Sequence, residues 1–254
     1  MRQPWLIDEL AYAGHEHLDP GFVAGYDRKQ GFPDAAEDVT VFRRHGLGSG
    51  STVLDLGAGT GQFALAAAPQ FGRVIAAEIS PVMVQVMRAR AAEAGLANVD
   101  PVQAGFLSYN HRGPPLDGVY TRNALHHLPD FWKAIALGRI ATVLRSGGVL
   151  RVHDLIYDFA PSEADAVFDR WFNLAVDDPA SGYTAADLAE HVRAEFSTYR
   201  WLFEPILAVA GFEILSAEFS GRVYGAYTCR KPWSDVREAI QWAAAQAAAR
   251  GHRP

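Results

Sequence analysis

A glycine-rich turn flanked by two acidic residues is the strongest chemical signal in the sequence. Gly57, Gly59 and Gly61 lie in the stretch VLDLGAGTGQF, and Asp55 stands two positions before the first of them. Glycine tolerates a positive φ and lets a ligand approach the backbone closely. A turn of this kind after the first strand of an open α/β sheet is typical of a nucleotide site, and Glu78 follows about 20 residues later, where a carboxylate can reach ribose hydroxyls.

The spacing of these glycines distinguishes between ligand classes. A dinucleotide fingerprint reads G-x-G-x-x-G, but Gln62 occupies the position of its third glycine and the pattern is G-x-G-x-G. The Asp55 carboxylate would repel a pyrophosphate and attract a cationic amino group or a sulfonium. The turn therefore disfavours a nicotinamide oxidoreductase and favours a positively charged ligand.

The elements predicted around the turn alternate as in a doubly wound α/β fold. Helices are expected to begin near Gly61, Pro81 and Pro129, because proline is tolerated in the first turn of a helix, and Ser80 is a natural N-cap. Five strands are expected, each apolar throughout, as when helices cover both faces of a parallel sheet: Thr52–Leu56, Arg73–Glu78, Val99–Gln103, Gly118–Thr121 and Gly148–His153.

The rest of the chain is expected to add helices and an antiparallel hairpin. Strands at Phe212–Phe219 and Arg222–Thr228 are separated only by Ser220 and Gly221, which is too short for a parallel crossover. An Ala-rich helix is expected from Trp233 to Arg250. We therefore predict a mostly parallel, seven-stranded sheet with an antiparallel terminal hairpin, in a single domain over residues 1–254.

Composition excludes several classes of protein. Hydrophobic residues make up 49% and charged residues 20% of the 254, as in a soluble globular protein. A net charge of −6 provides no global positive field for a nucleic-acid backbone. Cys229, the only cysteine, cannot form an intrachain disulfide, the N-terminus has no apolar signal-peptide core, and no run approaches a membrane span. We expect a cytoplasmic protein without nucleic-acid or membrane partners; the oligomeric state is left open.

Several stretches together resemble a known family. D-L-G-A-G-T-G followed by A-E-I-S-P is similar to the class I S-adenosylmethionine-dependent methyltransferases, over roughly residues 40–155 and the terminal hairpin. TRNALHHLPD and LRSGGVLRVHDL resemble, more narrowly, the small-molecule methyltransferases related to those of quinone biosynthesis. The resemblance implies a Rossmann-like methyltransferase fold, S-adenosylmethionine as cofactor, and in-line transfer of its methyl group to a small organic acceptor.

The resemblance also implies contacts to the methionine and ribose parts of the cofactor. Gly57 and Gly59 would lie against the methionine part, with Gly61 completing the cofactor-binding turn. Asp55 would lie near the amino group and Glu78 on the ribose hydroxyls.

Three further residues are implied at the ends of the cofactor. Ile79 would pack against adenine, and Asn123 would offer its backbone to the methionine end. Tyr26, in GYDRK, resembles a tyrosine that closes over the methionine carboxylate, although Tyr12 or a purely structural role for Tyr26 competes with this assignment.

The sequence departs from the family after the third strand. Relatives commonly carry an acidic residue in a stretch like VQAD, where it accepts a hydrogen bond from the adenine amino group, but the stretch here is VQAGF. Gly105 has no side chain to accept that bond. We expect Phe106 to lie on the adenine ring, and backbone or water to contact the amino group.

Histidines near the predicted crevice are the candidates for catalysis. His126 and His127 follow Asn123, and His153 and Asp154 end the fifth strand at the same edge. These residue types fit a metal site or an acid/base pair, and also simple packing at the entry to a helix. We expect no metal, take His126 and His127 as the catalytic candidates, favour positioning over base catalysis, and expect His153 to point into the sheet as a hydrogen-bonded residue.

Two segments are expected to close the acceptor site: residues 1–46, read as helices and loops, and a helical insertion over residues 156–205. Its aromatic side chains can line an apolar pocket or form the core of the insertion. A DNA amino-methyltransferase is disfavoured, because N-A-L-H stands where an N-P-P-Y-like block would hold a flipped base. The alternative function is a cofactor-binding protein without transfer activity that serves regulation or assembly.

Overall fold

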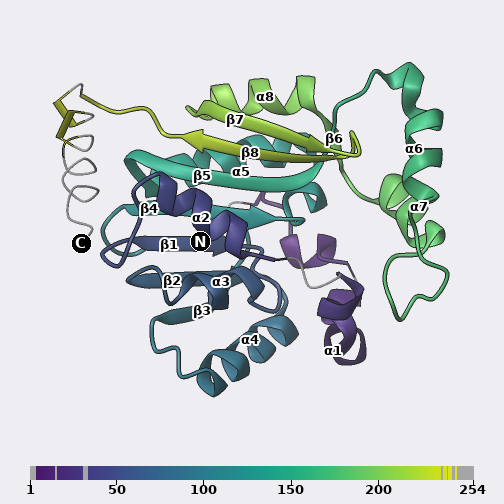
Figure 1. Cartoon of the computed structure of the whole chain (residues 1–254), viewed down its shortest axis with the longest axis horizontal. Coiled ribbons are helices and arrows are strands. Elements are labelled where there is room, and N and C mark those ends of the chain that lie inside the picture. Colours follow the sequence, from purple (N-terminus) through teal and green to yellow (C-terminus); the bar gives the residue numbers. More distant parts are fainter. Residues whose placement is uncertain are drawn as a thin grey trace, which may run out of the picture.

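A single mixed sheet organises the computed structural model, which describes residues 4–14, 16–30, 34–235, 237, 238, 240, 241 and 244 (Figure 1). Seven strands follow the order β3-β2-β1-β4-β5-β8-β7, and β6 pairs with β5. β1 to β5 run parallel, whereas β8 is antiparallel to both β5 and β7. The predicted doubly wound sheet with its terminal hairpin is confirmed. The strands are β1 Thr52–Leu56, β2 Arg73–Glu78, β3 Val99–Gln103, β4 Leu116–Arg122, β5 Leu144–Tyr157, β6 Thr198–Tyr199, β7 Glu213–Ser220 and β8 Tyr224–Arg230.

The helices begin where the sequence provides caps. The Ser80 hydroxyl accepts a hydrogen bond from the Met83 amide, and Pro81 takes the first helical position of α4, as predicted. The α-helices are α1 Pro20–Lys29, α2 Ala36–Arg44, α3 Gln62–Ala67, α4 Pro81–Glu93, α5 Asp130–Val143, α6 Ala164–Phe172, α7 Ala185–Ala194 and α8 Arg200–Val209. The 3-10 turns are η1 Glu9–Tyr12, η2 Glu16–Leu18, η3 Leu125–His127 and η4 Pro161–Glu163.

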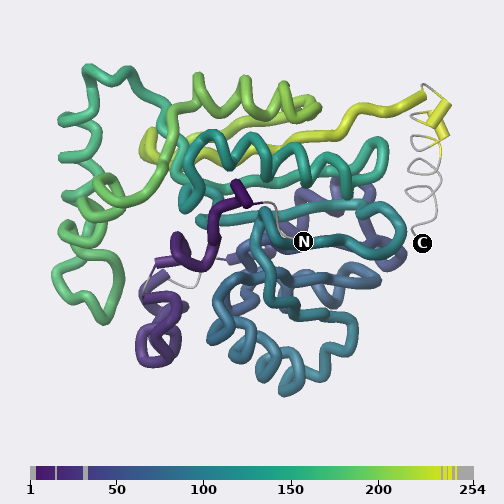
Figure 2. Tube along the Cα trace, turned by 180° about the vertical axis from the view of Figure 1, so that it is seen from behind, coloured from purple at the N-terminus to yellow at the C-terminus, as the bar shows by residue number. Residues whose placement is uncertain are grey.

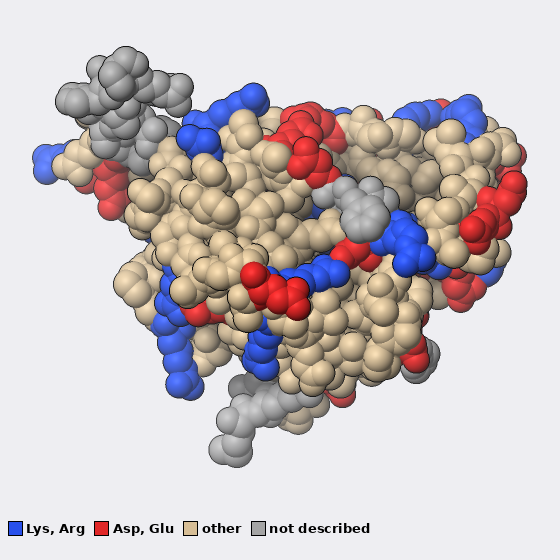
Figure 3. Space-filling model, turned by 60° about the horizontal axis from the view of Figure 1, so that its bottom comes forward, with Lys and Arg blue, Asp and Glu red and all other residues tan. Residues whose placement is uncertain are grey.

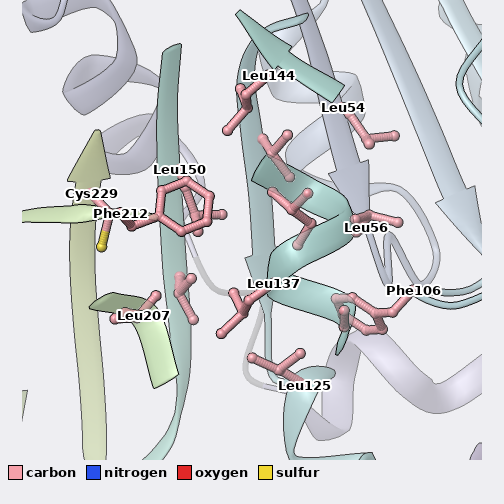
Figure 4. Packing of buried hydrophobic residues seen from close by; sticks show 14 of the residues in the cluster. Leu54, Leu56, Phe106, Leu125, Leu137, Leu144, Leu150, Leu207, Phe212 and Cys229 are labelled. Carbon is pink, nitrogen blue, oxygen red and sulfur yellow. The ribbon is translucent and has the colours of Figure 1, made fainter. Parts of the chain in front are cut away.

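Two apolar clusters cover the two faces of the sheet. On one face α2, α3 and α4 pack on Val53 and Val74, and on the other α5 and α8 pack on Leu54 and Leu150, with Leu207 contributed by α8 (Figure 4). Consecutive residues of a strand point to opposite faces, so Val53 and Leu54 belong to different clusters. This explains why the central strands are apolar throughout.

The carboxyl ends of the parallel strands bring the candidate residues to one edge. Asp55 pairs in register with Ala76 of β2 and Tyr120 of β4. The glycine turn follows β1, Glu78 ends β2, and Asn123 follows β4. Helix α1 and helices α6 and α7 lie at this same end of the molecule (Figures 1 and 2).

Two expectations about the later part of the chain change. β5 spans 14 residues, from Leu144 to Tyr157, because its last residues also pair with β6 and β8. α8 packs on α5 and β7, beside the sheet, so only α6 and α7 of the three helical segments form the outer wall. Most of the helix expected from Trp233 to Arg250 lies outside the described residues. Among the described residues, no helix has the length and apolar character needed to cross a membrane.

Candidate active site

The turn after β1 requires glycine at its ends. Gly57 has a φ of 73° and Gly61 a φ of 90°, in the left-handed region. A Cβ on Gly57 would lie closer to the Cβ of Ala124 than real Cβ atoms approach, and one on Gly61 would collide with the side chain of Met87. The glycines therefore let the turn pass between η3 and α4 while its backbone stays accessible.

Two small hollows lie on either side of this turn. The first, of about 60 Å³, is lined by Asp55, and the second, of about 70 Å³, by Glu78, Ile79 and Phe106. Four residues line both: Tyr26, Gly57, Gly59 and Asn123. An elongated ligand crossing the turn would thus meet a different carboxylate at each end.

The two carboxylates differ in how they are held. Glu78 accepts hydrogen bonds from the amides of Gly59 and Ser80, at 2.9 Å and 2.8 Å, and burial raises its pKa. Asp55 is 2% exposed, and its Oδ2 has no hydrogen-bond partner among the described residues. Burial, with a further contribution from the negative charge of Glu78, raises the pKa of Asp55 well above its ordinary value. A buried carboxylate oxygen without a partner suits a cationic ligand group.

A residue that the sequence did not indicate, Glu9 of η1, occupies the place of the missing acid at Gly105. A Cβ on Gly105 would lie within 3.0 Å of the Glu9 carboxyl group. Its Oε1 accepts from the Leu107 amide at 2.9 Å and its Oε2 from the Ser108 hydroxyl at 2.9 Å, and both Glu9 and Phe106 line the second hollow. A carboxylate therefore lies beside the hollow, contributed by the N-terminal segment instead of by β3.

The N-terminal segment is fastened over the glycine turn. Asp27 accepts a hydrogen bond from the hydroxyl of Thr60 and pairs with Arg90. Ser80 donates to the backbone oxygen of His17 at 2.6 Å. These contacts place Tyr26 against both hollows.

A cavity of about 1150 Å³ adjoins the two hollows. Tyr26 and Asn123 line all three spaces, and Tyr12 and His127 line both the cavity and the second hollow. The tyrosine named from the sequence and its competitor thus both border the cavity. α1 and α7 form opposite parts of its wall and are joined by the ion pair between Lys29 and Asp187, at 3.2 Å.

Histidines and carboxylates cluster on the wall of the cavity. His126 is 2% exposed; its Nδ1 lies 2.5 Å from Oδ1 of Asp154, and its Nε2 lies 3.1 Å from Oε2 of Glu195. Burial alone would lower the pKa of His126, but the two carboxylates outweigh burial and raise it. Nδ1 of His191 lies 2.5 Å from the same Glu195 oxygen. Burial lowers the pKa of the neighbouring His127.

The inner wall of the cavity rests on a buried charge network around Asp38. Asp38 accepts from Nε of Arg151 and from the hydroxyl of Tyr120, both at 2.9 Å, and Nε2 of His153 lies 3.1 Å from its Oδ1. Contrary to expectation, His153 is 22% exposed and lines the cavity, because β5 turns this side chain toward Asp38 of α2.

Comparison with known proteins agrees with the geometry of the turn. Residues 53–148 match the family model described as a methyltransferase domain. Residues 53–148 therefore form a methyltransferase domain, and the glycine turn and Glu78, which the sequence compares with class I S-adenosylmethionine-dependent methyltransferases, lie at its ligand-binding edge.

The chain is similar in sequence to the uncharacterized methyltransferase YcgJ of Bacillus subtilis, with 34% identity over 48% of this chain and 45% of YcgJ. The matched part thus spans less than half of that relative. Two solved structures share its fold. A SAM-dependent methyltransferase from Aquifex aeolicus has a TM-score of 0.56 at 18% identity, covering 84% of this chain and 98% of the other. Magnesium protoporphyrin IX methyltransferase of Synechocystis PCC 6803, solved with bound SAM, has a TM-score of 0.60 at 15% identity, covering 90% and 100%.

Proposed function

We propose that the protein transfers a methyl group from S-adenosylmethionine to a small organic acceptor, by in-line displacement, in the 1150 Å³ cavity. The observation that carries this proposal is the junction of three spaces at Tyr26 and Asn123. Two of them flank the glycine turn and hold one buried carboxylate each, and the third is large enough for a second molecule. The cofactor, when bound, supplies an electrophilic methyl group on a good leaving group.

Different residues around the turn bind different parts of the cofactor. Asp55 has a free buried oxygen for the amino group, and Glu78 faces the hollow expected to take the ribose. Ile79 and Phe106 provide apolar surface in that hollow for adenine, and Glu9 provides a carboxylate beside it.

On the acceptor side, the protein acts by positioning and by excluding water. Nδ1 of His126 lies 2.5 Å from Asp154 and Nε2 lies 3.1 Å from Glu195, so two carboxylates fix this side chain, which favours a positioning role over base catalysis. His127 lies where the cavity meets the second hollow, so it contacts the boundary between the two substrates. We propose that residues 1–46 and 156–205 close this cavity within a single domain.

The acceptor is a small molecule and the protein acts in the cytoplasm. Lys and Arg side chains alternate with Asp and Glu on the face shown in Figure 3, without a continuous basic stripe. The cavity wall is likewise mixed in charge, with Lys29, Arg122, Asp187 and Glu190 among its residues. These features favour an organic molecule with both polar and apolar parts over a nucleic acid.

Calorimetry tests the cofactor part of this proposal. We expect S-adenosylhomocysteine to bind with one molecule per chain and NAD not to bind. Asp55→Asn keeps the size of the side chain and removes its charge, so it should weaken S-adenosylhomocysteine binding, whereas Asp100→Asn, on the outer strand β3, should not. Binding of NAD without S-adenosylhomocysteine would refute the proposal.

Turnover tests the transfer itself. We expect S-adenosylhomocysteine to form from S-adenosylmethionine when a panel of hydroxyl, amine, thiol and activated-carbon acceptors is supplied. Cofactor binding without product on every acceptor class would favour the alternative, a regulatory or assembly protein.

A further inference from the structure

Two imidazoles and one carboxylate converge where the cavity meets the second hollow. One ligand atom of each of His126, His127 and Glu195 lies within 4.8 Å of the other two. His126 and His127 belong to η3, and Glu195 follows the last residue of α7. The cluster therefore joins two segments that are about 70 positions apart in the sequence, far more than one loop. The amide of Phe196 donates to the backbone oxygen of His126 at 2.9 Å, which fixes the two segments next to each other.

The atoms at the centre of this cluster lack hydrogen-bonding geometry. Nε2 of His126 and Oε2 of Glu195 lie 3.1 Å apart, yet neither has a hydrogen-bond partner among the described residues, although both atoms are buried. Buried polar atoms are normally hydrogen-bonded. Ligand atoms of one tetrahedral ion at about 2.0–2.2 Å would lie a little over 3 Å from each other, close to the separation seen here.

Two of the three ligands have an outer partner that fixes their orientation. Asp154 holds Nδ1 of His126 and is itself fixed by the amides of Leu125 and Leu155, each at 2.8 Å. This carboxylate–histidine pair leaves Nε2 of His126 directed at the cluster, the arrangement that orients histidine ligands of zinc. On the other side, His191 lies against the ligating oxygen of Glu195.

We propose that His126, His127 and Glu195 bind one divalent transition-metal ion of the zinc type, whose open position faces the cavity and takes an oxygen of the methyl acceptor. Two imidazoles with one carboxylate suit Zn²⁺, Co²⁺ or Fe²⁺ better than Mg²⁺ or Ca²⁺. Three protein ligands leave a position open, as catalytic zinc sites do. This inference revises the expectation of a site without metal.

An ion held by His126, His127 and Glu195 would supply Lewis-acid activation of an acceptor hydroxyl: it would lower the pKa of the hydroxyl, so that the proton could pass to solvent in the cavity while the oxygen kept the electron pair. The inference rests on the proposed function and narrows it, because it selects acceptors that offer a hydroxyl oxygen.

Metal titration of the full chain tests the site without any acceptor. Chelator-treated protein is titrated with Zn²⁺ by calorimetry and with Co²⁺ by visible absorption. We expect one ion per chain and the intense visible bands of low-coordinate Co²⁺. Glu195→Gln and His127→Ala should each weaken uptake at least about tenfold, the scale seen when even outer partners of a metal are lost.

Matched variants separate ligands from bystanders. Glu190→Gln changes a carboxylate on the same helix that lies against Arg193, and His153→Gln changes a histidine that lines the same cavity but faces Asp38. Both should bind the ion like the wild type. S-adenosylhomocysteine binding, measured in the presence of chelator, reports folding and the cofactor site for every variant.

Two results would overturn the metal site. One is wild-type protein that takes up no Zn²⁺ or Co²⁺ while it still binds S-adenosylhomocysteine, which would make the cluster an ion pair of imidazolium and carboxylates. The other is uptake that Glu195→Gln and His127→Ala leave unchanged. Failure to bind S-adenosylhomocysteine, by contrast, would count against the proposed function.

Discussion

The cofactor side and the acceptor side of the site are built in different ways. Asp55, Gly57 and Glu78 stand at the ends of adjacent parallel strands, so the sheet alone brings them together. His126 and Glu195 meet only because α7 and its following turn fold back on η3. The cofactor side therefore has a readable sequence motif, and the acceptor side has none.

The two sides also differ in the state of their carboxylates. Burial raises the pKa of Asp55 and of Glu78, and backbone amides and nearby His17 only partly offset this for Glu78. Burial acts in the same direction on Asp154 and Glu195, but His126, together with His191 at Glu195, outweighs it and lowers the pKa of both. The carboxylates of the cofactor side are thus available to a positive ligand, whereas those of the acceptor side are already paired with histidines.

The largest effect is expected from removing Asp38 beneath the cavity. Asp38→Ala leaves Arg151, 2% exposed, without its carboxylate and should reduce the free energy of unfolding by about 3–5 kcal/mol. Urea denaturation measures it. Asp100→Ala is the control, because the exposed pair of Asp100 with Arg73 should contribute no more than about 1 kcal/mol. A small loss for Asp38→Ala would show that the cavity wall does not depend on this network.

The same carboxylate predicts a pH dependence. Burial would raise the pKa of Asp38, but hydrogen bonds from His153 and Arg151 outweigh it and lower the pKa to about 2, from 3.8. The stabilisation by Asp38 should therefore be complete above pH 3.8 and disappear as the pH falls toward 2. The difference in unfolding free energy between wild type and Asp38→Asn, followed over this range, should shrink with falling pH. A constant difference would contradict the assignment.

The sequence predicted the cofactor side of the site better than the acceptor side. β1, β2 and β3 have the predicted bounds, because their apolar runs end at turn residues and caps such as Gly57 and Ser80. Glu9 was missed because it reaches the hollow through a tertiary contact across more than 90 positions. The absence of an acid at Gly105 was the signal that could have prompted a search for it. Asp154 was noted at the end of the fifth strand but not paired with His126, and Glu195 left no signal, because it lies in no motif.

An intermediate effect is expected from Glu78 on the cofactor side. Glu78→Ala removes a buried charged acceptor and strands the amides of Gly59 and Ser80, so S-adenosylhomocysteine should bind about 1.5–3 kcal/mol more weakly by calorimetry. Glu93→Ala, at the far end of α4, is the matched control and should bind normally. An unchanged affinity in Glu78→Ala would remove this residue from the cofactor site.

The smallest effect is expected from Glu9. Like Glu195 on the acceptor side, this residue reaches its site through a contact between segments that are distant in the sequence. Glu9→Gln keeps an acceptor beside Gly105 but removes its charge. A charged hydrogen bond is about twice as strong as a neutral one, so S-adenosylhomocysteine should bind about 1 kcal/mol more weakly. A purine ligand, in which hydrogen replaces the adenine amino group, offers no such donor.

Measuring the affinity of wild type and Glu9→Gln for both ligands gives a thermodynamic cycle, which isolates the contact between Glu9 and the adenine amino group. If Glu9 accepts from the adenine amino group, the purine ligand should not lose affinity in Glu9→Gln, since it has no donor at that edge for the carboxylate to accept from. Equal losses for both ligands would mean that Glu9 acts only by holding Leu107 and Ser108. The adenine amino group would then be contacted by backbone or water, as the sequence suggested. In that case every residue that binds the cofactor would lie at or next to a sequence motif, and only the acceptor side would depend on contacts between distant segments.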